Sequence, residues 1–67
     1  MRPKIVRLCI YPKDIQRITG KSDRYSRELL RKIRLHLRKQ DHQLVTVEEF
    51  STYMGLSLEA VQQFIID

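Results

Sequence analysis

Residues 22–39 read SDRYSRELLRKIRLHLRK and decide the fold. Ser22 is a favoured N-cap residue, because its hydroxyl can accept a hydrogen bond from a backbone N–H of the first turn. Asp23 then places negative charge at the positive end of the helix dipole, and Lys39 places positive charge at the other end. The interior has no Gly or Pro and is rich in Leu, Arg and Lys, which favour helix. The pattern predicts one long helix over residues 22–39.

Two different faces run along this predicted helix. Apolar residues recur every four positions and predict a buried face: Tyr25, Leu29, Ile33 and Leu37, with Ser26 and Leu30 beside them. Arginines alternate spacings of three and four along another side: Arg24, Arg27, Arg31, Arg34 and Arg38. Side chains at these spacings are neighbours, so the five guanidinium groups repel one another, and Glu28 relieves only part of this. Such an arginine row favours contact with an external polyanion, and the alternative is a solvated charged face.

Charge is divided unevenly along the chain. All 13 basic residues lie at or before Lys39, where three acids reduce the charge to +10. From Gln40 onward there are five acids and no Lys or Arg, so this half carries −5. A basic half this concentrated attracts phosphates and speeds association with them.

Length and composition predict one domain, residues 1–67, with a small core. Cys9 is the single cysteine and lies in an apolar run, so we expect a buried structural thiol in a reducing cytoplasm. No apolar segment approaches the roughly 20 residues that span a bilayer, and the N-terminus lacks the features of a signal peptide. We therefore expect a cytoplasmic protein without a membrane partner.

The segment before residue 22 predicts a helix–turn–helix plan. We expect residues 1–4 to form a basic arm, in which Arg2 and Lys4 could follow a minor groove. Residues 5–11 are apolar and β-branched and predict a short strand, whose one candidate partner is residues 43–47. Pro12 suits the first turn of a short helix through Thr19 that turns Ile15 and Ile18 inward, and Gly20 ends it.

The C-terminal half repeats this plan. Thr46 and Glu49 form a capping-box pattern that predicts a helix over residues 47–54, ended by Gly55. Ser57 caps a last helix from residue 58 to about 65. Gly20 and Gly55 lie 35 positions apart, and the same offset matches Ile15 with Phe50 and Ser22 with Ser57. We predict a mainly α fold: four helices as two helix–turn–helix units around one core (basic unit 11–39, acidic unit 46–66), with at most a short two-stranded ribbon.

The run TVEEFSTYMGLSLEAVQQFI, residues 46–65, resembles the helix–turn–helix superfamily of DNA-binding proteins. Phe50 and Met54 occupy its apolar positions before the glycine, Ser51 its small position, and apolar residues follow the glycine at Leu56, Val61 and Phe64. The leading strand, short helix and ITGKS turn of the N-terminal unit resemble the small excisionase-like and MerR-like DNA-binding domains, although Lys21 and Ser26 depart from the usual apolar pattern. In such domains a β-ribbon wing follows the second helix, and residues 43–47 are a poor version of it.

We expect the basic unit to contact DNA, because the acidic unit has no cation to offset its repulsion of the phosphates. We expect a small DNA-binding protein, a transcriptional regulator or an accessory factor for recombination, that contacts duplex DNA. The guanidinium groups would bind phosphates and guanine edges, with the basic residues before them bracing the backbone and the Ser22 cap offering N–H groups. The candidate DNA-binding residues are Lys13, Arg17, Lys21, Ser22, Arg24, Arg27, Arg31, Arg34 and Arg38.

Catalytic, metal and cofactor sites are not expected. His36, His42 and Cys9 lack zinc-site spacing, and no nucleophile, paired-acid or phosphate-loop pattern occurs. Four aromatic residues at helical positions predict core packing: Tyr25, Phe50, Tyr53 and Phe64. Two other functions stay open: RNA binding through the same arginines, and a protein-interaction module that docks acidic partners or associates with itself. The apolar residues 64–66 could supply a homodimer interface.

Overall fold

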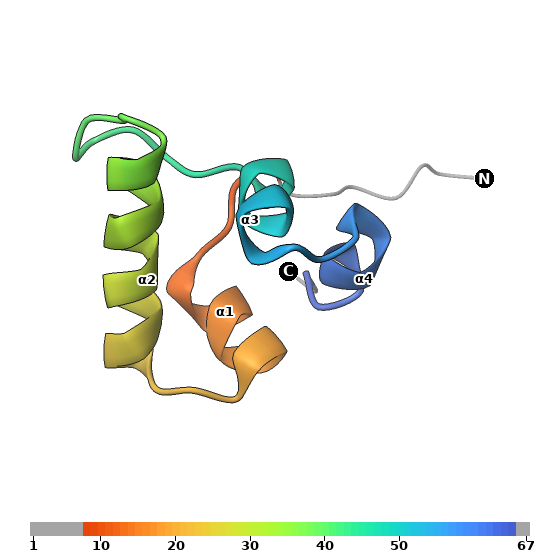
Figure 1. Ribbon diagram of the computed structural model, residues 1–67. Coiled ribbons are helices and arrows are strands. Elements are labelled where there is room, and N and C mark those ends of the chain that lie inside the picture. The colour runs from red at the N-terminus through yellow and green to blue at the C-terminus, as the bar shows by residue number, and fades with distance from the viewer. Residues whose placement is uncertain (1–7, 66–67) are drawn as a thin grey trace.

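Four helices in two pairs make up the computed structural model, which describes residues 8–65 (Figure 1). Helix α1 (Pro12–Thr19) packs on α2 (Asp23–His36), and α3 (Val47–Met54) packs on α4 (Leu58–Gln62). The predicted mainly α fold is confirmed. Within the described residues there is no strand, and none of the helices there is long and apolar enough to cross a membrane.

The predicted ribbon is reduced to an isolated antiparallel bridge between Cys9 and Thr46. Beside it, the N–H of Ile10 donates to the carbonyl of Val45 (3.0 Å) and the N–H of Val47 donates to the carbonyl of Leu8 (2.8 Å). Cys9 is half-buried, so the prediction of a buried thiol was wrong. The predicted basic arm (residues 1–4) and the first part of the predicted strand lie outside the described residues.

The 35-residue repeat is visible in the local geometry of both units. Gly20 and Gly55 both have left-handed backbones, with φ of 74° and 73°. Ser22 and Ser57 both accept a hydrogen bond from the N–H three residues on, each at 3.1 Å. The left-handed conformation is nearly free of steric cost for glycine, which is why both helices end there.

One hydrogen bond beside the bridge joins equivalent positions of the two units. Ile10 and Val45 are 35 residues apart, and they are hydrogen-bonded across the antiparallel bridge. Helices α2 and α4 lie on opposite sides of the molecule (Figure 1).

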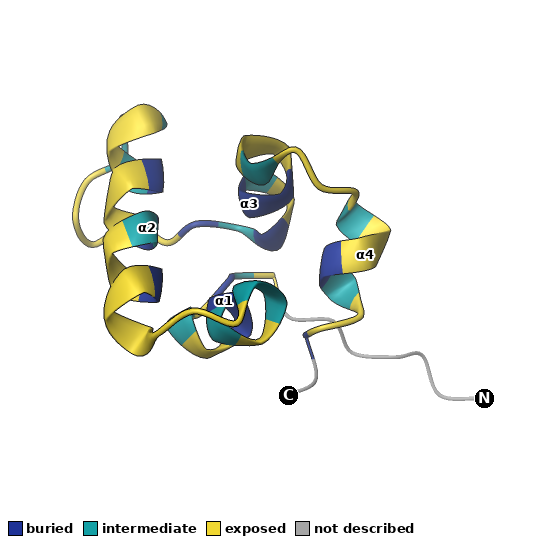
Figure 2. Cartoon of the chain, turned by 60° about the horizontal axis from the view of Figure 1, so that its bottom comes forward, coloured by how far each residue is buried: buried dark blue, intermediate teal, exposed yellow. Residues whose placement is uncertain are grey.

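One core lies between the two pairs, and Phe50 is fully buried in it, as expected. The packing prediction was wrong for Tyr25, Tyr53 and Phe64, which are each about 40% exposed. The face of α2 that meets α1 and the core carries Ser26, Leu30 and Ile33, with Leu29 and Leu37 partly buried (Figure 2). Ser26 is fully buried on this face, whereas Tyr25 lies at its edge and is 41% exposed.

Helix α2 ends before the predicted residue 39, because the chain turns left-handed at Arg38 (φ 59°). The N–H of Lys39 donates to the carbonyl of Arg34 (2.8 Å), and the N–H of Arg38 donates to that of Leu35 (3.1 Å). This pair of bonds is the Schellman motif, which usually has glycine at the left-handed position. Arginine at this position does not indicate a helix end in the sequence. The predicted helix was therefore three residues too long, with its end at residue 39 instead of His36.

Helix α4 also ends early, at Gln62 instead of about residue 65. The N–H of Phe64 donates to Val61 (2.9 Å) and that of Ile65 donates to Gln62 (3.1 Å). Bonds to the third residue back tighten the last turn and satisfy carbonyls at the helix end. Ile65 is thereby buried in the core while Phe64 stays at the surface.

The predicted capping box at the start of α3 is present. The N–H of Glu49 donates to Thr46 Oγ1 (2.9 Å), and the N–H of Thr46 donates to Glu49 Oε1 (3.0 Å). Lys39 reaches the other carboxylate oxygen at 3.2 Å. The Thr46 N–H, followed by Lys39, lowers the pKa of Glu49 from its ordinary 4.5.

We predict that Phe50→Ala costs about 3–5 kcal/mol, because it removes a fully buried ring and leaves a cavity. A chain of this length has a free energy of unfolding of roughly 3–10 kcal/mol, so this variant should lose most of its cooperative thermal transition. Phe64→Ala is the matched control, and it should cost about 1 kcal/mol or less. Equal losses in circular-dichroism melts of the two variants would contradict the described core.

We predict that Arg38→Gly raises the free energy of unfolding by about 0.5–1 kcal/mol. A left-handed L-residue costs roughly 1–2 kcal/mol, and the greater freedom of glycine in the unfolded chain offsets part of that gain. Gln40→Gly, at an exposed position without positive φ, should instead destabilise. Chemical denaturation measures both, and a loss of stability in Arg38→Gly would show that α2 does not end as described.

We predict that Glu49→Gln lowers stability at pH 7 and that this deficit disappears at low pH. Because the folded pKa is lowered, the ionised carboxylate stabilises the fold above pH 4.5, and this contribution is lost as the pH falls through the folded pKa. Glu48→Gln removes the same charge from an exposed neighbour and is the control. Urea unfolding at pH 3 and pH 7 distinguishes them, and an identical pH dependence would count against the contacts of Glu49.

Candidate nucleic-acid interface

The packing of α2 divides the predicted arginine row into two parts. Arg27 and Arg34 lie three residues before and four after buried Leu30, so they border the buried face. Arg24 and Arg31 lie further round the helix and are exposed. The outer side of α2 is exposed along its length (Figure 2). Arg38, predicted as the fifth member of the row, lies beyond the end of the helix.

Two carboxylates of α2 pair with arginines of the row. Arg27 Nε is 2.7 Å from Asp23 Oδ2, and Arg31 Nη2 is 3.0 Å from Glu28 Oε1. The hydrogen bond from Arg31, followed by its charge, lowers the pKa of Glu28. Both pairs are more than half exposed, and exposed pairs contribute little and exchange readily with other partners.

The row is not neutralised by these pairs. Helix α2 contains five Lys and Arg side chains and two carboxylates. Across the part of the chain that the structure describes, Arg24, Lys32 and Arg34 make no ion pair, and the ion pair that links the basic half to the acids after residue 40 is Lys39–Glu49. The α2 arginines are therefore not matched by the acidic half of this molecule.

The candidates before α2 surround its N-terminal end. Lys13 and Arg17 are exposed on α1, and Arg17 Nη1 lies 3.6 Å from the fully buried carboxylate of Asp14. Lys21 Nζ lies 5.9 Å from the centre of the Tyr25 ring, within cation–π range. The Ser22 hydroxyl accepts the bond from Tyr25, so it serves as the helix cap. Asp23 puts negative charge next to the N–H groups that a phosphate would approach.

A groove runs between α2 and the segment before α1, which we call the arginine groove. Its volume is about 230 Å³. Arg27 and Arg34 line it together with apolar and aromatic side chains that include Tyr11, Leu30, Leu44 and Val45. Sequence reasoning missed it, because only the Cys9–Thr46 bridge brings Tyr11 and Leu44 to the side of α2.

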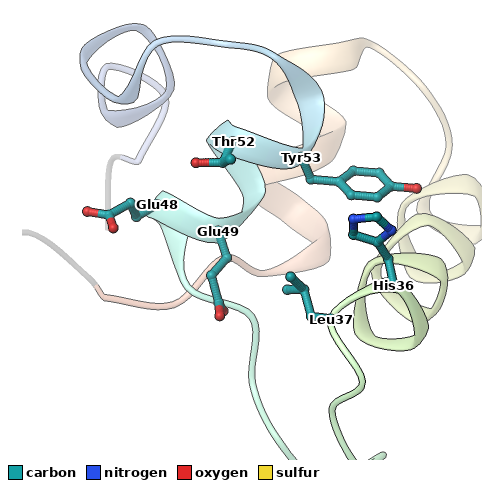
Figure 3. Close-up of a pocket in the computed structure, with 6 residues that line it drawn as sticks. All are labelled: His36, Leu37, Glu48, Glu49, Thr52 and Tyr53. Carbon is teal, nitrogen blue, oxygen red and sulfur yellow. The ribbon is translucent and has the colours of Figure 1, made fainter.

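A second hollow, of about 360 Å³, lies between the last turn of α2 and α3. Figure 3 shows His36 and Tyr53 facing each other from the two helices, with ring centres 5.2 Å apart and planes at 70°. Glu48 points away from both rings (Figure 3). Among residues 8–65 there is no group of three His, Cys, Asp or Glu side chains that could hold a metal ion.

Comparison of the chain with protein-family models, curated proteins and solved structures finds no significant match in any of the three. The function is therefore inferred from the side chains and geometry of this molecule.

Proposed function

We propose that the protein binds nucleic acid, with duplex DNA as its target, through the outer face of α2, and acts as a small transcriptional regulator or recombination accessory factor. The observation that carries the proposal is the row of arginines on an exposed helix without matching acids from the other half of the chain. Neutralising DNA phosphates releases condensed counterions, which gives such a face favourable binding energy at low salt.

Each part of the surface has a separate role in this proposal. Arg24 and Arg31 point outward and contact phosphates or guanine edges, where a guanidinium can pair with O6 and N7. Lys13, Arg17 and Lys21 brace the backbone beside the N-terminal end of α2. Arg38 contacts a phosphate from the turn beyond the helix. The two exposed α2 ion pairs open when phosphate replaces carboxylate, at little cost.

The α2–α3 hollow favours a second candidate, self-association of the protein. Glu48 and Glu49 line this hollow, and arginines of another copy would complement their charge. Size-exclusion chromatography at low and high salt tests it: an oligomer that dissociates at high salt, with no retention on DNA, would favour self-association over DNA binding.

RNA would bind the same arginines, and competition between duplex DNA and structured RNA separates these two targets.

We predict that Arg24→Ala and Arg31→Ala each weaken binding to a random-sequence duplex. Each should also reduce the slope of log K against log salt concentration by about 0.9, the value for one phosphate contact. Fluorescence anisotropy from about 50 to 200 mM salt measures both quantities.

Lys32→Ala is the matched control, since it removes one exposed cation from the same helix but outside the arginine row. We expect it to leave the salt slope close to that of the parent protein. Equal effects of Lys32→Ala and Arg31→Ala would mean that charge acts diffusely and would refute the assignment to this face.

A further inference from the structure

The arginine groove combines an apolar surface with two positively charged side chains. The backbone of a regular duplex offers phosphates for the charges but no apolar group for the surface. Its floor is apolar, with Leu30 and Val45 buried at 7% and 2% exposure. Tyr11 and Leu44 stand at its edge and remain 40% and 59% exposed. Two guanidinium groups, from Arg27 and Arg34, complete the lining. A ligand that satisfies the whole groove must carry both an anion and a flat apolar surface.

Arg34 shows most clearly that the groove is suited to a polar partner. Its Nε is buried and has no hydrogen-bond partner within the described residues. The Arg34 guanidinium is therefore incompletely satisfied, and an anion in the groove that meets the rest of this group would form a charge-assisted interaction with it. Arg27, two turns earlier on α2, lines the same groove, and its exposed ion pair with Asp23 (2.7 Å) can exchange for another anion.

Resting on the proposed function, we infer that the arginine groove binds one unpaired nucleotide of the nucleic acid, with its base on the apolar floor and its phosphate on Arg34 and Arg27. The volume of about 230 Å³ is below that of pockets for drug-sized ligands, roughly 300–1,000 Å³, and suits a single base. A phosphate alone would leave the apolar floor open to water. A paired base is enclosed in the stack and cannot enter, whereas an unpaired base can stack on an aromatic or apolar surface.

The direct test compares two labelled duplexes with the same flanking sequence, one fully paired and one with a single unpaired 2-aminopurine. We expect the parent protein to bind the second duplex at least about fivefold more tightly, since stacking of one base supplies a gain of this order. The 2-aminopurine emission should change on binding, because the base moves from the helix into the groove.

Two pairs of variants locate this effect. Leu44→Gln and Arg34→Gln change the groove, and both should abolish the preference for the unpaired nucleotide. Leu35→Gln and Lys32→Gln remove an apolar side chain and a cation at exposed positions outside both the groove and the arginine row, and should preserve it. Leu44 is 59% exposed, so its substitution leaves the fold intact, and a circular-dichroism melt verifies this.

The outcomes separate this inference from the proposed function. Salt-dependent binding of both duplexes with equal affinity would overturn the groove assignment and leave DNA binding in place. A preference that survives in Leu44→Gln and Arg34→Gln would also overturn it, because the unpaired base would then be held elsewhere. Absence of binding to either duplex would overturn both proposals together.

Discussion

The bridge between Cys9 and Thr46 is the contact on which the arrangement of the molecule depends. A helix pair of this size buries too little apolar surface to be stable alone, because small chains leave a large part of their surface in water. The bridge holds two such pairs together, with Ile10 and Val45 both buried beside it. Glu48 and Glu49 of the second unit lie at the last turn of α2, where Glu49 pairs with Lys39, and within the described residues no arginine of the row pairs with an acid of that unit.

The arginines of α2 repel one another, and the carboxylates that relieve this repulsion are those of α2 itself. Arginines at spacings of three and four repel one another by a few tenths of a kcal/mol for each pair. Asp23 and Glu28 relieve part of that repulsion from within α2. Apolar packing at Leu30 and Ile33 holds the helix in place despite the rest. A partner with many phosphates would remove this repulsion on binding, which connects the stability of α2 to the proposed function.

The parts of the fold that sequence predicted are those with local causes. Ser22, Thr46 and Ser57 cap helices through bonds to residues three positions away, and both glycines adopt the left-handed turn. The errors arose where a residue adopts a conformation that is unusual for its type or where tertiary contacts decide. The end of α2 at Arg38 needs a left-handed residue that sequence rules assign to glycine. The burial of Ser26 in place of Tyr25 depends on which side of α2 packs against the rest of the molecule, and the arginine groove depends on a bridge between residues far apart in the chain.

The most direct test of the central claim is a map of the binding surface by nuclear magnetic resonance. The ¹⁵N-labelled protein would be titrated with a random-sequence duplex at low salt, and amide shifts would be followed residue by residue. We predict that the shifts concentrate on α2 and the N-terminal part of α1, that α4 stays unchanged, and that the shifts reverse when salt is added. Shifts concentrated on α3 and α4, or no shifts at low salt, would contradict a nucleic-acid interface built on the arginines of α2.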